Sequence, residues 1–145
     1  MELKDLYREI VNEHNLHPAH KGELEHPSMI LNGVNPSCGD DIYLQLQLDD
    51  GGVVTDGKFN GSGCAISQAS ADMMLDVIIG KPKEEALKLA ETFMGMVRST
   101  VDPAEIEALE EAAALESIAH MPARVKCATL GWKTMQRMLR DGETS

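Results

Sequence analysis

Three cysteines, the only ones in this 145-residue chain, lie in three separate segments that are interrupted by glycine or proline. Cys38, Cys64 and Cys127 stand in the sequences NPSCGD, GSGCAIS and PARVKCA. An odd number of cysteines does not fit a disulfide framework, whereas thiolates at turns and helix starts commonly serve metal or redox chemistry. Spacing alone also allows three ordinary buried residues, because free cysteine is often buried. We favour one shared metal or sulfur site.

Asp40 is the fourth residue that we assign to this site. It follows Cys38 by two positions, so an extended backbone would project both side chains to the same side. Gly39 between them allows a close backbone approach. Three thiolates and one carboxylate satisfy four-coordinate Zn²⁺, which accepts both sulfur and oxygen ligands.

The other two cysteines are expected at helix starts. Cys64 precedes a predicted helix, and Cys127 is placed in the first turn of the last helix, with Arg124 three residues before it. Backbone N–H groups and positive charge at a helix start favour the thiolate form of a cysteine. Both thiols are therefore expected to have a lowered pKa.

Composition narrows the class of protein. Twenty-four acidic against 13 basic residues give a net charge of −11, which repels phosphate backbones and argues against a nucleic-acid partner. No apolar run approaches the roughly 20 residues that span a bilayer, so no membrane partner is expected and the protein is predicted to be cytoplasmic. A hydrophobic content of 43% suffices for the core of one domain, residues 1–145.

The hydrophobic pattern predicts an α+β fold, with a small three-stranded antiparallel sheet packed against about five helices. A helix is expected before Pro18, and apolar residues alternate with polar ones from Ile42 to Leu48 as in a half-buried strand. The predicted strands begin near residues 29, 42 and 53, and the later helices cover residues 66–78, 87–97, 103–117 and 122 onward. Asp102 is predicted to cap the helix at residues 103–117, which is acidic and which we expect to be exposed.

The last helix places Val125, Ala128, Trp132 and other apolar residues on one face and Cys127 on a neighbouring one, so Cys127 need not be core.

The five histidines are not assigned to the site. His14, His17 and His20 are spaced three apart, but Pro18 interrupts the helix that would align them, so we expect them to be solvated. His120 precedes the third cysteine segment by seven residues and is left out of the ligand set, which Asp40 completes.

The segments NPSCGD, GSGCAISQAS (residues 61–70) and PARVKCATLGW (residues 122–132) resemble the three signature motifs of the IscU/NifU N-terminal superfamily of iron–sulfur cluster assembly proteins. They resemble its SufU branch in particular. General scaffolds of the superfamily carry histidine immediately before the third cysteine, where this chain has Lys126, and residues 99–120 resemble the extra segment of the SufU branch. The resemblance implies an IscU/SufE-like fold.

It further implies that Cys38, Asp40, Cys64 and Cys127 bind zinc and that Cys38 is the catalytic thiol. The implied function is that of a zinc-dependent sulfurtransferase, in which a docked cysteine desulfurase frees Cys38 from the metal and transfers persulfide sulfur to it. The implied partners are a pyridoxal-phosphate desulfurase like SufS and an assembly complex like SufB, SufC and SufD. Arg124 would act at the desulfurase interface or near the metal.

Two other functions remain open. Three cysteines and one further ligand also suit iron or a [2Fe–2S] cluster, as on an assembly scaffold. Alternatively, the zinc is structural and the protein is a binding module that modulates a partner.

Overall fold

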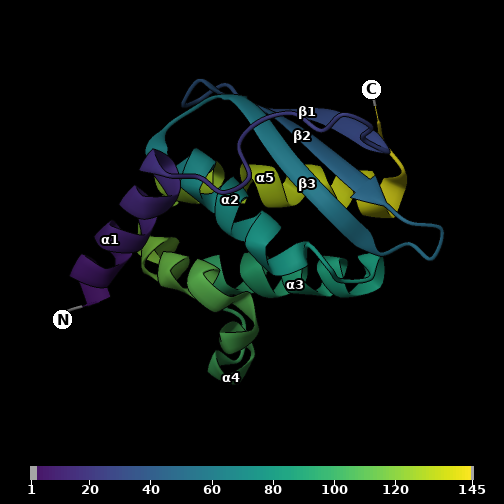
Figure 1. Ribbon diagram of the computed structural model, residues 1–145. Helices are drawn as coiled ribbons and strands as arrows, with labels where there is room; N and C mark the ends of the chain where they lie inside the picture. Colours follow the sequence, from purple (N-terminus) through teal and green to yellow (C-terminus); the bar gives the residue numbers. More distant parts are fainter. Residues whose placement is uncertain (1–2, 145) are drawn as a thin grey trace.

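The computed structural model describes residues 3–144, so the first two residues and the last residue of the predicted 1–145 domain lie outside the description. A three-stranded antiparallel sheet with helices against it confirms the predicted α+β class (Figure 1). The strands are β1 (Met29–Asn35), β2 (Asp40–Leu48) and β3 (Val54–Ser62). The helices are α1 (Leu3–Leu16), α2 (Ala65–Ile78), α3 (Lys83–Val97), α4 (Pro103–Ile106), the 3₁₀ helix η1 (Glu107–His120) and α5 (Pro122–Asp141). Within residues 3–144, none of the helices combines the length and apolar character that crossing a membrane requires.

The sheet is the predicted meander, with β2 in the centre of the order β1-β2-β3. Ile42, Leu44 and Leu46 are buried, as the alternation of apolar and polar residues predicted. Gln45 is an exception because it points the other way and is still buried. Its side-chain oxygen accepts the backbone N–H of Leu24 at 2.8 Å, so the segment before β1 covers that part of the second face.

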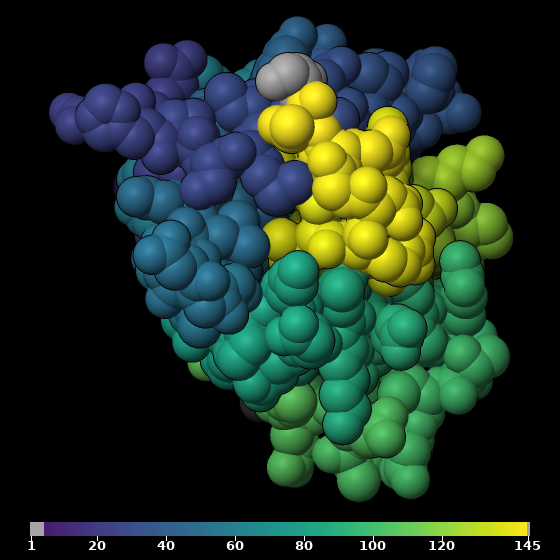
Figure 2. Space-filling view, turned by 90° about the vertical axis from the view of Figure 1, so that its right-hand side faces the viewer, coloured from purple at the N-terminus to yellow at the C-terminus, as the bar shows by residue number. Residues whose placement is uncertain are grey.

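Helix α5, the last helix, packs against α2, and both helices lie on the sheet (Figure 1). The Ser70 hydroxyl of α2 donates to the carbonyl of Ala128 at 2.6 Å and accepts the indole N–H of Trp132 at 3.1 Å. Trp132 also stacks on Phe93 of α3, with ring centroids 4.4 Å apart. Figure 2 shows the end of α5, in yellow, emerging between the blue strands and the teal-green α3. The helix that carries Cys127 is thus held by hydrogen bonds and by aromatic packing.

The segment from 102 to 120 differs from the single exposed helix that the sequence predicted. Asp102 does cap a helix, since its carboxylate accepts the N–H of Ala104 at 2.9 Å, but α4 ends four residues later at Ile106. A 3₁₀ helix follows, interrupted at Glu110, whose φ is 53°. It buries four apolar residues spaced three apart: Leu109, Ala112, Leu115 and Ile118. A 3₁₀ helix has three residues per turn, so this spacing lines up on one buried face and the segment is only half exposed.

The expectation that the first three histidines are solvated is wrong for two of them. His17 is exposed, but His14 is buried and lies between two carboxylates, with Nδ1 2.6 Å from Asp72 and Nε2 3.0 Å from Glu111. The imidazole of His20 lies 2.7 Å from Asp76. Pro18 does end the helix as predicted, but the chain then turns back along α2, which supplies acidic partners that are more than 50 residues away in the sequence.

We predict that His14→Gln destabilises the fold more at low pH than at high pH. Burial alone would lower the pKa of His14, but hydrogen bonds to Asp72 and Glu111 outweigh it, so its pKa lies above the ordinary value. The charged form therefore stabilises the folded state fully below about pH 6.5, and this contribution is lost as the pH rises through the raised pKa. Loss of a hydrogen bond between charged groups lowers the free energy of unfolding by about 1.5–3 kcal/mol.

Urea unfolding with no divalent cation added, at about pH 6 and pH 9, measures this difference. His17→Gln is the matched control, because that exposed ring should change stability little at either pH. Equal destabilisation by His14→Gln at both pH values would contradict the assignment.

Candidate metal centre

Cys38 and Asp40 belong to the tight turn between β1 and β2. The backbone N–H of Cys38 donates to the carbonyl of Asn35 at 3.3 Å, and Gly39 has a φ of +72°, which favours glycine. Cys38 is exposed, whereas Asp40, the first residue of β2, is fully buried. The two side chains do lie together, but a left-handed turn brings them together rather than the extended backbone that the sequence suggested.

Cys64 lies at the N-cap of α2, as predicted. Its sulfur accepts the backbone N–H of Ser67 at 3.4 Å, and its own N–H donates to Asp40 at 2.9 Å. Gly63, the preceding residue, packs against the same two side chains, since a Cβ there would lie 2.5 Å from the Ser67 hydroxyl and 2.9 Å from the Asp40 carboxylate. The glycine before the cysteine thus makes room for the buried aspartate.

Cys127 corrects two expectations. It is completely buried, although the helical pattern allowed an exposed position, and it is the sixth residue of α5, in the second turn rather than the first. Its backbone N–H is therefore inside the helix. Burial raises the pKa of the Cys127 thiol, and the neighbouring thiols of Cys38 and Cys64 and the Asp40 carboxylate raise it further. The predicted lowering of its pKa by the helix start is wrong, because desolvation and nearby acidic groups dominate.

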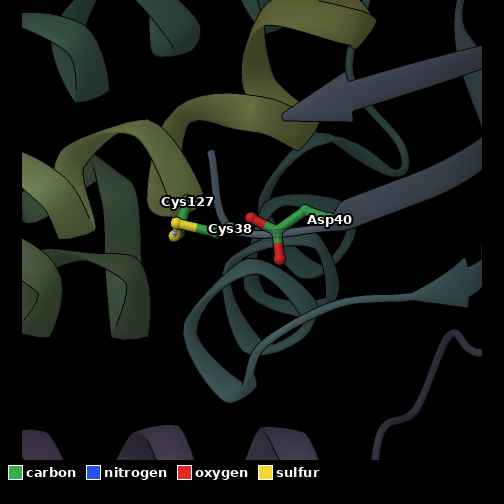
Figure 3. A group of neighbouring side chains, drawn as sticks. All are labelled: Cys38, Asp40 and Cys127. Atoms are coloured by element: carbon green, nitrogen blue, oxygen red, sulfur yellow. Dashed lines mark hydrogen bonds between the residues drawn. The ribbon is translucent and has the colours of Figure 1, made fainter. Parts of the chain in front are cut away.

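Three of the four assigned side chains converge (Figure 3). The sulfur atoms of Cys127 and Cys38 are 3.1 Å apart, and one ligand atom each from Cys38, Asp40 and Cys127 lies within 4.8 Å of the other two. The sulfur of Cys64 does not lie within this distance of all three, although the backbone N–H of Cys64 donates a hydrogen bond to Asp40. The chain therefore joins the β1–β2 turn, the start of α2 and α5 at one point.

Asp40 is held as a carboxylate by donors from several segments. Burial alone would raise its pKa, but hydrogen bonds from the Cys64 N–H, the Ser67 hydroxyl, the Cys127 thiol and the Asn35 amide lower it below the ordinary value. The Ser67 hydroxyl lies 3.1 Å from one carboxylate oxygen and the Asn35 amide 3.2 Å from the other. Sequence reasoning assigned no role to Asn35 or Ser67. Two features of the sequence could have identified them: Asn35 opens the segment NPSCGD, and Ser67 stands three residues after the predicted helix cap.

The basic residues near the site are at the surface. Arg124, in the first turn of α5, and Lys126 are both exposed. Tyr7 of α1 is also close to the site. The pKa of Tyr7 lies above its ordinary value, because burial and the charge of Cys64 raise it more than the charge of Arg124 lowers it. His120 is exposed and lines a cavity of about 490 Å³ between α1 and η1, together with Tyr7. It is not a member of the converging set.

The donor set suits a thiophilic divalent cation. Two sulfur atoms and a carboxylate already converge, a third thiol lies beside them, and Asn35 and Ser67 orient the carboxylate from outside the set. Sulfur ligands with one oxygen match the preferences of Zn²⁺, and hydrogen-bonded outer groups of this kind are typical of metal sites.

A small α+β domain in which two cysteines and an aspartate converge, with a third cysteine beside them, is typical of metal- or sulfur-handling proteins. Residues 6–128 match the family described as NifU-like N terminal domain. The chain belongs to this family, as its three motifs indicated.

Relatives with different names are equally similar to the chain. It is 42% identical over 140 residues to "Iron-sulfur cluster assembly scaffold protein IscU" of Streptococcus pyogenes, covering 96% of this chain and 86% of that protein. It is also 42% identical over 140 residues to "Zinc-dependent sulfurtransferase SufU" of Bacillus subtilis, covering 93% and 90%. A solved structure from Fervidobacterium islandicum, of a candidate scaffold protein for the SUF system, has a TM-score of 0.86 at 34% identity, over 93% of this chain and 97% of that one.

We predict that Gly63→Ala destabilises the protein, because the added methyl group would collide with Ser67 and Asp40, which are both buried. Overpacking of this kind typically costs about 1–3 kcal/mol. Gly51→Ala is the matched control, since a Cβ there would lie 3.4 Å from the Asp49 carboxylate, which is an ordinary contact distance. Urea unfolding of both variants measures the difference, and equal stabilities would show that the contact with Gly63 is not a constraint.

Proposed function

We propose that this protein accepts sulfur as a persulfide on Cys38 from a pyridoxal-phosphate cysteine desulfurase and passes it to iron–sulfur cluster assembly. Zn²⁺ would be held by Cys38, Asp40, Cys64 and Cys127. The observation that carries the proposal is the unequal exposure of the thiols, since Cys38 is exposed, Cys64 is partly buried and Cys127 is buried. Cys38 is the most exposed of the three thiols and can meet a macromolecular partner at the surface.

Zinc, when bound, keeps cysteine ligands deprotonated and therefore nucleophilic. The Cys38 sulfur then attacks the outer sulfur of the persulfide on the desulfurase cysteine. A new sulfur–sulfur bond forms on Cys38, the bond within the donor persulfide breaks, and the desulfurase cysteine leaves as a thiolate. No external oxidant or reductant is needed, because this is thiol exchange at a sulfur–sulfur bond.

The turn geometry supports this role for Cys38. The side chain lies in the four-residue connection between two strands, and Gly39 beside it has no atom within 4 Å of the position that a Cβ would occupy. A partner's cysteine can therefore approach from solvent. Asp40 and Cys127 lie behind Cys38 in the protein interior, where hydrogen bonds and helix packing hold them.

The second candidate function is that of a scaffold for a [2Fe–2S] cluster, which the names of the streptococcal and Fervidobacterium relatives favour. Three cysteines with one further ligand are adequate for such a cluster. Lys126, which precedes Cys127, is exposed and offers no imidazole. The fourth ligand of this chain would therefore be Asp40 and not a histidine beside Cys127. We therefore rank zinc-dependent sulfur transfer first.

We predict that Cys38→Ala abolishes the stimulation of a cysteine desulfurase, reducing cysteine turnover to that of the desulfurase alone. Zinc and iron are measured in the purified proteins, and turnover is followed as alanine release. Ser37→Ala, in the same exposed turn, is the control and should stimulate as the parent protein does.

Full stimulation by Cys38→Ala would exclude Cys38 as the acceptor. Iron with a visible cluster chromophore in the parent protein would favour the scaffold, and zinc without stimulation would favour a structural zinc module. Loss of fold on chelation, without any effect on sulfur transfer, would also support the structural role.

For Arg124 we propose a role in docking the desulfurase, because this cation is exposed at the start of the helix that carries Cys127 on a chain of net charge −11. Arg124→Ala should raise the concentration of this protein needed for half-maximal stimulation by up to about fivefold. This factor corresponds to the loss of one exposed ion pair, about 1 kcal/mol at most. The zinc content should not change. Arg140→Ala, at the far end of the same helix, is the control, and an equal effect of both variants would indicate a general charge effect instead.

A further inference from the structure

A second group of metal-ligating side chains lies where α1 and the segment after it meet α2 and η1. It consists of His14, His20, Asp72, Asp76 and Glu111. Asp72 and Asp76 follow Cys64 by eight and twelve residues along α2, which places them about 12 and 18 Å along the helix from the thiol centre. The two groups share no residue.

Four side chains of this group offer ligands of the right kinds. One ligand atom each from His14, Asp76 and Glu111 lies within 4.8 Å of the other two, and the His20 Nε2 lies 2.7 Å from Asp76. Two imidazoles and two carboxylates are ligands that Zn²⁺ and related transition metals accept. His20 is outside the mutually close set, so its ring would have to move to join the other three ligands.

Asp72 orients the His14 ring for such a role. It is buried, it lies 2.6 Å from the Nδ1 of His14, and its other oxygen accepts the backbone N–H of His20 at 2.8 Å. A buried carboxylate on one ring nitrogen fixes the tautomer and leaves the other nitrogen for a metal, as in carboxylate–histidine–metal arrangements. The Nε2 of His14 faces Glu111, one of the candidate ligands.

Charge also favours a cation here. The group contains three carboxylates, and the ion pairs that they make within residues 3–144 are with histidine. When both imidazoles are neutral, the formal charge of the group is −3. The side chains of Asp76 and Glu111 are 40% and 60% exposed, so an ion can enter from solvent.

We propose that His14, His20, Asp76 and Glu111 form a second site for a divalent transition-metal cation such as Zn²⁺, with Asp72 as the group that positions His14. The cation would fasten α1 to α2 and to η1. The proposal does not depend on sulfur transfer.

The test is a titration of the purified protein, already holding one equivalent of Zn²⁺, with Co²⁺. One further equivalent should bind with the visible absorption of cobalt in nitrogen and oxygen ligands and without a sulfur-to-cobalt charge-transfer band, and should raise the Tm. The double variant Asp76→Asn, Glu111→Gln should bind this equivalent at least about 10-fold more weakly, since loss of even an outer-shell partner typically costs that much. Both changes are at exposed side chains, and urea unfolding checks that the variant is folded in spite of the lost contact between Glu111 and His14. Glu107→Gln, also exposed on η1, is the matched control.

Absence of a second equivalent would overturn the proposal. So would equal binding by the double variant, or a spectrum containing only the sulfur-to-cobalt band, which would mean that Co²⁺ simply replaces zinc at the thiols. A fourfold or greater weakening by His20→Gln alone would support His20 as the fourth ligand, since removal of one ligand should weaken binding without abolishing it.

Discussion

The buried carboxylate of Asp40 is the interaction on which the thiol centre depends. It accepts hydrogen bonds from the backbone of Cys64, the hydroxyl of Ser67 and the amide of Asn35, so the end of β1, the start of β2 and the start of α2 are tied to one side chain. Leaving a carboxylate of this kind unpaired in the interior would be costly, and the surrounding donors are therefore constrained with it. Gly63 leaves room for the carboxylate, and Gly39 allows the turn that carries Cys38 past it.

The thiol of Cys127 is brought to Asp40 by long-range contacts of α5. Cys127 is 89 residues from Cys38 in the chain, yet their sulfur atoms are 3.1 Å apart because α5 is fixed on α2 through Ser70 and on α3 through Trp132. The result is a centre with one solvent-facing thiol and two that are anchored in the fold. This asymmetry is what a sulfur carrier requires, since its reactive thiol must reach a partner while its other ligands stay in place.

Local patterns in the sequence predicted most of the elements, whereas long-range contacts decided the details. Alternation in β2, the end of α1 before Pro18 and the cap at Asp102 are local signals, and each appears in the structure. The 3₁₀ form of residues 107–120 was missed because the helix was predicted from its cap at Asp102 and its acidic composition, without regard to the apolar spacing of three. Four residues were assigned to the thiol centre from their types and motifs, and three of them, Cys38, Asp40 and Cys127, converge in the structure. The burial of Cys127 and the pairing of His14 with Asp72 follow from tertiary packing across 58 residues or more, which local patterns do not report.

The central claim is that Cys38 is the thiol that carries sulfur, and peptide mass spectrometry tests it most directly. The protein is incubated with a cysteine desulfurase and cysteine, blocked with an alkylating agent and digested. The account predicts one added sulfur atom on the peptide that contains Cys38 and none on those that contain Cys64 or Cys127. An added sulfur atom on Cys64 or Cys127 with none on Cys38, or none on any of the three, would contradict it.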